Sequence, residues 1–151
     1  MAETIPPAPK PILPICAAIY RPVAPLANAF MRFCAGAIFI PHGAQKLLGG
    51  AAADKFVVAL GLANPAPWAA FLGTLELAGG IMLALGLLTR PVALLLAAEL
   101  LTMIFAVHVH NGFAWSSGGV QYPLLLLALC LAALFRGGGR YSLDRLIGKE
   151  F

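Results

Sequence analysis

The chain has 151 residues, of which 61% are hydrophobic and only 11% are charged. Soluble domains usually carry about 25% charged residues, so this composition excludes an ordinary water-soluble fold. The net charge is +4, but most basic residues flank apolar segments, which favours a role in membrane topology over nucleic-acid binding. A spanning helix needs about 20 apolar residues, so the chain suffices for four spans, short connections and no separate catalytic domain. We therefore expect an all-α integral membrane protein, a four-helix bundle.

Residues 1–25 contain seven prolines and no unbroken apolar segment long enough for a signal peptide. This composition predicts an extended or interfacial N-terminal arm. The first span is predicted at about 26–48, where the apolar sequence is interrupted by Arg32, His42 and Lys46.

The next two spans are predicted at about 68–88 and 91–109, after a loop that carries a short interfacial helix at 54–62. Thr89 is placed as the helix N-cap of the third span and Pro91 as its first helical residue, so the two spans form a tight antiparallel hairpin. The second span contains Glu76 and the third contains Glu99.

A polar loop then leads to a fourth span at about 122–135, followed by a basic tail, 136–151, with a short amphipathic helix from Ser142 onward. The bundle therefore covers 26–135. The positive-inside rule places both termini in the cytoplasm, because seven of the ten basic residues fall on one side of the predicted spans. These seven are Lys10, Arg21, Arg90, Arg136, Arg140, Arg145 and Lys149.

Ionisable side chains inside the hydrocarbon layer are costly unless they are paired or face water, so each one is a candidate functional residue. At a rise of 1.5 Å per residue, Glu76 lies near the depth of His42, and Glu99 near that of Arg32. We therefore predict contacts of His42 or Lys46 with Glu76, and a structural ion pair between Arg32 and Glu99.

Further polar residues gather at the outer ends of the third and fourth spans: His108, His110, Asn111, Gln121 and Tyr122. With His42, Lys46 and Glu76, they predict an outward-facing pocket that fits a quinone head group or a small anion. The alternative is that the buried charges only fix helix register. An apolar pocket touching His42 and Glu76 favours quinone binding, whereas tight contacts without space favour scaffolding. No metal site is predicted, because His108 and His110 point to different faces of a helix and no third ligand is evident.

Four sequence blocks together resemble the DoxX family of small bacterial membrane proteins: RFxxGxxFIPHGxQKL, FLGTLELAGGIMLALGLLTR, GFxWxxGGVQYP and GGGRYSLD. The resemblance covers about residues 26–146 and implies a four-helix bundle in the bacterial inner membrane. The positions that match the family motifs are Arg32, His42, Gly43, Lys46, Glu76, Gly79, Gly80, Gly86, Arg90, Gly119, Tyr122, Pro123, Gly139 and Asp144.

The family takes its name from a subunit of an archaeal thiosulfate:quinone oxidoreductase. The resemblance thus implies a small membrane subunit of a respiratory or other redox complex, which anchors a partner oxidoreductase and lines a quinone site. Catalysis by the chain alone is not expected, nor is a covalently bound cofactor. The alternative is a non-catalytic assembly or structural factor. A transporter or channel is least favoured, since the two halves of the chain are not alike and the fourth span has almost no ionisable groups.

Overall fold

The computed structural model describes residues 14–48, 59–61 and 65–149, and all regular structure in these ranges is helical, which confirms the predicted all-α class. The helices are α1 (Pro14–Leu47), α3 (Pro65–Leu85), α4 (Thr89–Met103), α5 (Gln121–Arg136) and α6 (Leu143–Ile147). Beyond α4 the chain continues through a π-helical turn, Ile104–His108, and a 3₁₀ turn, Val109–Asn111.

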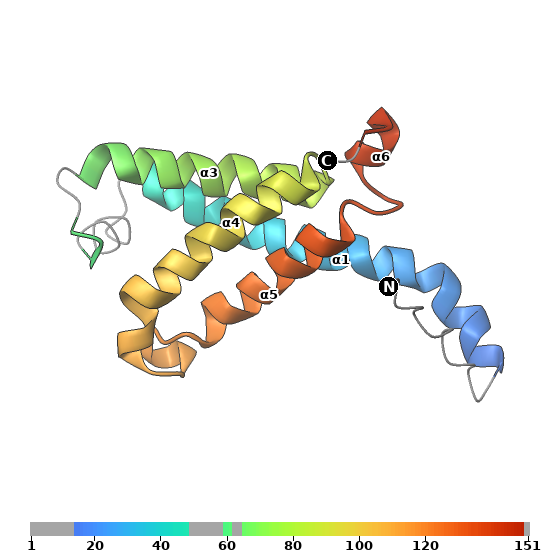
Figure 1. Cartoon of the computed structure of the whole chain (residues 1–151), viewed down its shortest axis with the longest axis horizontal. Helices are drawn as coiled ribbons and strands as arrows, with labels where there is room; N and C mark the ends of the chain where they lie inside the picture. The colour runs from blue at the N-terminus through green and yellow to red at the C-terminus, as the bar shows by residue number, and fades with distance from the viewer. Residues whose placement is uncertain (1–13, 49–58, 62–64, 150–151) are drawn as a thin grey trace, which may run out of the picture.

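The four longer helices form two pairs, α1 with α3 and α4 with α5, joined by the α3–α4 hairpin (Figure 1). In the first pair, glycines stand seven residues apart on each helix: Gly36 and Gly43 on α1, Gly73 and Gly80 on α3. A Cβ atom on Gly36 would collide with the backbone oxygen of Gly80. Small residues thus let the two backbones approach closely, which is how membrane helices commonly associate.

Apolar side chains fill the space between the pairs, and many more cover the outside of the bundle. The largest fully buried side chains include Phe39, Leu83 and Leu96. Large hydrophobic residues are exposed on every long helix, for example Phe30, Phe71, Leu94 and Leu125. Such an apolar exterior is expected of a surface in contact with lipid rather than water.

Three helical segments in the described residues are long and apolar enough to cross a membrane: Ala18–Leu47, Ala66–Leu85 and Thr89–Asn111. The predicted fourth span corresponds to α5, which is apolar but has only 16 residues. This length gives a rise of about 24 Å, less than the hydrocarbon thickness of about 30 Å. The count of four spans therefore stays a prediction.

The N-terminal half of α1 differs from the prediction. The helix begins at Pro14 rather than near residue 26, so the extended form of the predicted arm is wrong for residues 14–25, and its interfacial form stays a prediction. Residues 1–13 lie outside the described part. Proline suits the first position of a helix because it lacks only a donor that would be unpaired there. Pro22 and Pro25 stand inside the helix, on a segment that projects beyond the other long helices (Figure 1). The predicted interfacial helix at 54–62 lies mostly outside the described residues.

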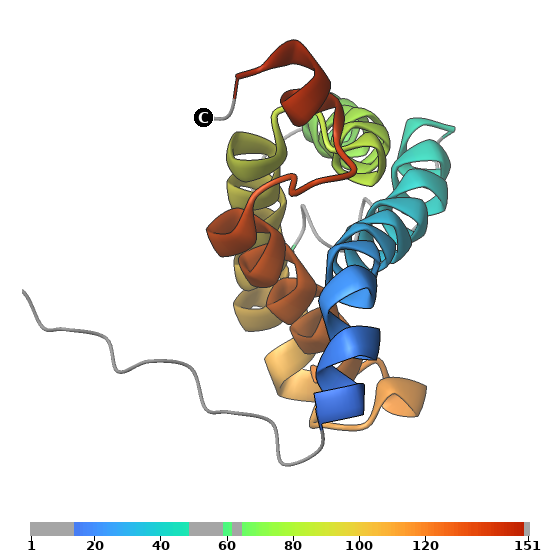
Figure 2. The ribbon, with the colours of Figure 1, turned by 90° about the vertical axis from the view of Figure 1, so that its right-hand side faces the viewer.

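The C-terminal tail packs over the α3–α4 hairpin (Figure 2). The Leu88 and Thr89 amides donate hydrogen bonds to Asp144, at 2.6 and 2.9 Å, and the Thr89 hydroxyl donates a third, at 2.7 Å. Asp144 therefore supplies the cap of α4, and the predicted N-cap role of Thr89 is wrong: the cap position is Leu88, in the left-handed region. The predicted helix after Ser142 is confirmed as α6, with the Ser142 hydroxyl accepting from the Arg145 amide.

Candidate functional site

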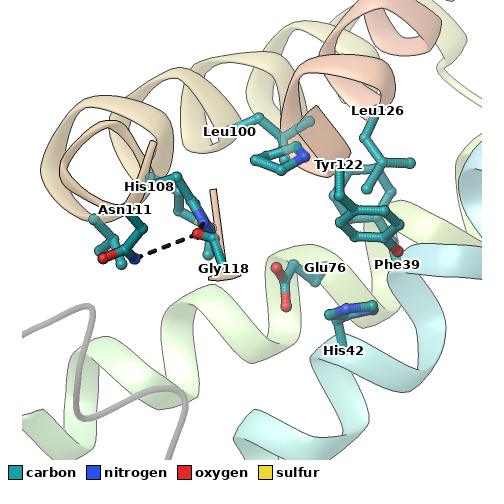
Figure 3. A pocket seen from close by; sticks show the side chains of 12 residues that line it. Phe39, His42, Glu76, Leu100, His108, Asn111, Gly118, Tyr122 and Leu126 are labelled. Atoms are coloured by element: carbon teal, nitrogen blue, oxygen red, sulfur yellow. Dashed lines mark hydrogen bonds between the residues drawn. The ribbon is translucent and has the colours of Figure 1, made fainter. Parts of the chain in front are cut away.

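A cavity of about 340 Å³ lies between the two helix pairs, near the loop that joins α4 to α5. Its wall is mostly apolar, with a few polar side chains converging on it from different helices (Figure 3). The lining residues are Phe39, His42, Glu76, Leu100, Met103, Val107, His108, Asn111, Gly118, Tyr122, Pro123 and Leu126. Size and lining both match those of small-molecule sites.

His42 on α1 and Tyr122 on α5 meet across one side of the cavity (Figure 3). Their rings are stacked, with centroids 6.1 Å apart and an angle of 27° between the planes. His42 Nδ1 lies 2.8 Å from the Ile38 carbonyl oxygen. Because a carbonyl can only accept, Nδ1 carries the proton, and Nε2 of the neutral ring is left as an acceptor.

His108 lies on the opposite side, at the end of the π-helical turn. Its Nδ1 donates to the Gly118 carbonyl at 2.6 Å, and the Asn111 amide donates to the same oxygen at 3.3 Å. These bonds hold the α4–α5 loop against the cavity. A π-helical turn inserts one residue into a helix and is frequent at functional sites.

Glu76 on α3 belongs both to the cavity wall and to a buried charge cluster. Lys46 Nζ lies 2.8 Å from Glu76 Oε1 and 3.3 Å from Glu99 Oε1. All three side chains are at most 5% exposed. The second carboxylate oxygens of Glu76 and Glu99 are buried and have no hydrogen-bond partner among the described residues.

This cluster of Lys46, Glu76 and Glu99, hereafter the buried triad, carries one positive and two negative charges when all its groups are ionised. It joins α1, α3 and α4, so it fixes the relative register of three helices. It also places one carboxylate at the edge of the cavity, where a ligand can exchange a hydrogen bond with it.

The predicted ion pair between Arg32 and Glu99 is wrong. Arg32 instead donates to the carbonyl oxygens of Leu83, Ala84 and Tyr141, at 2.9, 3.1 and 2.6 Å. It therefore lies at the level of the α3–α4 turn, while Glu99 lies ten residues into α4, about 15 Å along the helix axis. α1 begins at Pro14 and runs past the α3–α4 turn, so a depth counted from residue 26 does not give the level of Arg32 relative to that turn.

The other predicted site residues divide into two groups. His42, Glu76, His108 and Tyr122 line the cavity, whereas Lys46 lies behind it and contacts Glu76. His110 and Gln121 are exposed and do not line it, and the Gln121 side chain accepts from the Trp115 amide at 3.3 Å. Within the described ranges, no three side chains of His, Cys, Asp or Glu gather closely enough to hold a metal ion.

The sequence-based prediction did not include the apolar wall. Leu100, Met103 and Val107 come from α4 and the turn that follows it, and Pro123 and Leu126 come from α5. Spacings of three and four residues put such side chains on one helix face, so this pattern was a usable signal. It does not show which face of α4 meets an open space.

Sequence comparison relates this chain to known membrane proteins. The DoxX family model matches residues 27–109. An uncharacterized protein of Haemophilus influenzae is 33% identical over 83% of this chain and 94% of its own length. A Bacillus subtilis protein named "Putative oxidoreductase CatD" is 29% identical over 82% of this chain and 89% of its own length. The Escherichia coli inner membrane protein YqjF is 30% identical over 76% of this chain and 86% of its own length. No solved structure matches.

Proposed function

The chain belongs to the DoxX family, and from this membership and the cavity we propose that it is a small membrane subunit of a redox complex. In this role it anchors a partner oxidoreductase and binds a quinone between its two helix pairs. One observation carries the proposal: an apolar cavity into which His42, Glu76, His108 and Tyr122 converge from different helices. A relative with oxidoreductase in its name supports it.

The protein is a multi-pass inner-membrane protein, as its family, its apolar helices and its Escherichia coli relative indicate. In the proposed topology α5 is a fourth span, because it packs along α4 and shares the depth of a helix that can cross the bilayer. Local thinning of the bilayer accommodates its short length. Arg90, Arg136 and Arg140 then face the cytoplasm, with both termini, and the cavity opens toward the outer surface.

The residues around the cavity fit a quinone head group. A quinone takes up electrons and protons at its two carbonyl oxygens, so its site needs apolar walls and hydrogen-bonding groups at opposite edges. Leu100, Met103 and Leu126 supply apolar walls. Tyr122 offers a hydroxyl that can donate to a quinone carbonyl, and His42 offers Nε2, which can accept from a quinol hydroxyl. Glu76 holds a carboxylate at the rim, suited to binding or passing a proton.

The first test measures binding of ubiquinone-1 and menadione to the purified protein in detergent by calorimetry. We expect saturable binding, weakened about tenfold by Tyr122→Phe because the hydroxyl that donates to a quinone carbonyl is lost. Met103→Trp reduces the space in the cavity without replacing any of its polar side chains and should abolish binding. Gln45→Ala is the control, because Gln45 is an exposed polar residue of α1 that does not line the cavity. Equal binding by wild type and Met103→Trp, or no binding by wild type, would contradict the quinone site.

The second test concerns the partner. Tagged protein is purified in mild detergent from its native membrane, and the same fraction is analysed by mass spectrometry and absorption spectroscopy. Stoichiometric recovery of an enzyme that carries flavin, haem or metal is expected. A colourless protein without a stoichiometric partner would refute the subunit role.

A non-catalytic assembly or structural factor is the second candidate, and the buried triad favours it. The triad links three helices through contacts of 2.8 and 3.3 Å, as a device that only fixes helix packing would. This candidate predicts that filling the cavity with Met103→Trp leaves every cellular phenotype of the protein unchanged. The quinone-site proposal predicts that the same variant folds but loses function.

A further inference from the structure

A second pocket, of about 320 Å³, lies at the opposite end of the bundle from the quinone-site cavity, between the end of α5 and the C-terminal tail. Four of its lining residues are cationic: Arg136, Arg140, Arg145 and Lys149. None of these four side chains forms a hydrogen bond or ion pair with any residue in the described ranges. The pocket is thus rich in unused donors.

The acidic residue of this pocket, Asp144, forms no ion pair with the four cations in the described part of the chain. Both oxygens of the Asp144 carboxylate already accept hydrogen bonds, from the Leu88 amide and from the amide and hydroxyl of Thr89. Its side chain is buried, with the residue only 4% exposed. The formal charge of the lining side chains is therefore +3, directed toward whatever occupies the pocket.

The pocket is also held in place before any ligand arrives. Asp144 pins the tail to the start of α4, and Arg32 pins it to α1 and the end of α3 through the Tyr141 carbonyl. Ser142 further orders the turn by accepting from the Arg145 amide. A site built on such contacts loses little entropy when it binds.

Exposed apolar residues close in sequence to the lining cations indicate the kind of anion. Phe135, Leu146 and Ile147 are 77%, 82% and 58% exposed, and all are close in sequence to the lining cations. A free phosphate ion would leave these apolar side chains uncovered. A phospholipid would cover them, because its phosphodiester contacts the cations while its acyl chains contact the apolar groups.

We propose that this pocket binds the headgroup of an anionic phospholipid, such as phosphatidylglycerol, through the side chains of Arg136, Arg140, Arg145 and Lys149. The site is separate from the quinone-site cavity and does not depend on the proposed redox role. It attaches the tail, and through it the α3–α4 hairpin, to one membrane surface.

The test is native mass spectrometry of the full-length protein released from nanodiscs that contain equal amounts of phosphatidylglycerol and phosphatidylethanolamine. We expect retention of phosphatidylglycerol in preference to phosphatidylethanolamine. Arg140→Gln and Arg145→Gln should each weaken this retention about fivefold, and together about thirtyfold. Arg21→Gln removes an exposed cation of α1 outside the pocket and should leave it unchanged.

Three results would overturn the proposal. Equal retention of the two lipids would exclude a site for anionic headgroups. An equal effect of Arg21→Gln and Arg140→Gln would show that only overall charge matters. Displacement of the lipid by millimolar inorganic phosphate or glycerophosphate would identify a soluble phosphate compound as the occupant. Thermal melting of each variant distinguishes loss of the site from loss of the fold.

Discussion

Removal of the one cation from the buried triad should be far more damaging than removal of either carboxylate. With Lys46→Met, the carboxylates of Glu76 and Glu99 remain close together without their shared partner. With Glu99→Gln, one positive and one negative charge remain and balance each other. The two substitutions change the same cluster by one charge each, so their difference measures charge balance rather than packing.

The geometry sets the magnitude. At an effective dielectric constant of about 20, unit charges 2.8 Å apart attract by about 6 kcal/mol, and those 3.3 Å apart by about 5 kcal/mol. Desolvation offsets most of this gain, and breaking a buried pair typically costs about 3–5 kcal/mol. The two paired oxygens lie within about 6 Å of each other, which adds a repulsion of about 3 kcal/mol when Lys46 is gone and both remain ionised.

We therefore expect Lys46→Met to reduce stability by at least about 3 kcal/mol, and Glu99→Gln by about 1 kcal/mol. The assay is thermal unfolding in detergent followed by tryptophan fluorescence, in which 1 kcal/mol corresponds to roughly 2–4 °C. Gln45→Met, at the exposed neighbouring position, is the control. The triple variant Lys46→Met, Glu76→Gln, Glu99→Gln should regain most of the loss. Equal melting temperatures for Lys46→Met and Glu99→Gln would refute the reasoning.

Two further predictions concern other parts of the bundle. Gly80→Ala should destabilise the α1–α3 pair by about 1–3 kcal/mol, because its Cβ would stand 2.8 Å from the Gly36 oxygen. Gly79→Ala is the control: its Cβ would make an ordinary contact of 3.4 Å with Leu96, so stability should change by less than about 0.5 kcal/mol. Equal melting temperatures of the two variants would contradict this prediction. Asp144→Ala should lower the free energy of unfolding by about 2 kcal/mol, because the amides at the start of α4 lose their acceptor. It should also make the tail sensitive to limited proteolysis, and a tail as resistant as in wild type would argue against the contacts of Asp144 with α4.

The sequence was sufficient to predict the helical class and the approximate positions of the helices, because these follow from apolar length and turn residues. The spans predicted at 68–88 and 91–109 correspond to α3 and to α4 with its extension. The prediction placed the start of α1 too late, because the seven prolines in residues 1–25 indicated a segment without a helix. A proline inside a helix at a membrane interface is less damaging than one in a soluble helix, since neighbouring groups and water pair with the freed carbonyls.

Side-chain partners were harder to predict than helices. The contact of Lys46 with Glu76 was among those predicted. Glu99, the second partner of Lys46, was instead predicted to pair with Arg32. Depth estimates depend on where each helix begins, and an error of a few residues moves a side chain by several ångströms. The contacts of the C-terminal tail could not be predicted for another reason. A loop that returns to cap α4 with Asp144 leaves no periodic pattern in the sequence.

The two proposed roles of the bundle meet at Glu76. Its Oε1 atom is held by Lys46, which is a structural use of the residue. Glu76 also lines the cavity, and its Oε2 atom has no hydrogen-bond partner among the described residues. A buried unpaired acceptor costs about 1–3 kcal/mol, and both carboxylates of the triad keep one such oxygen in the described part of the chain. Glu76 lines the cavity whereas Glu99 does not, so only the Glu76 Oε2 atom is placed to accept a hydrogen bond from a bound ligand. A quinol hydroxyl is such a donor and a quinone carbonyl is not, so the reduced form of the proposed ligand fits this atom.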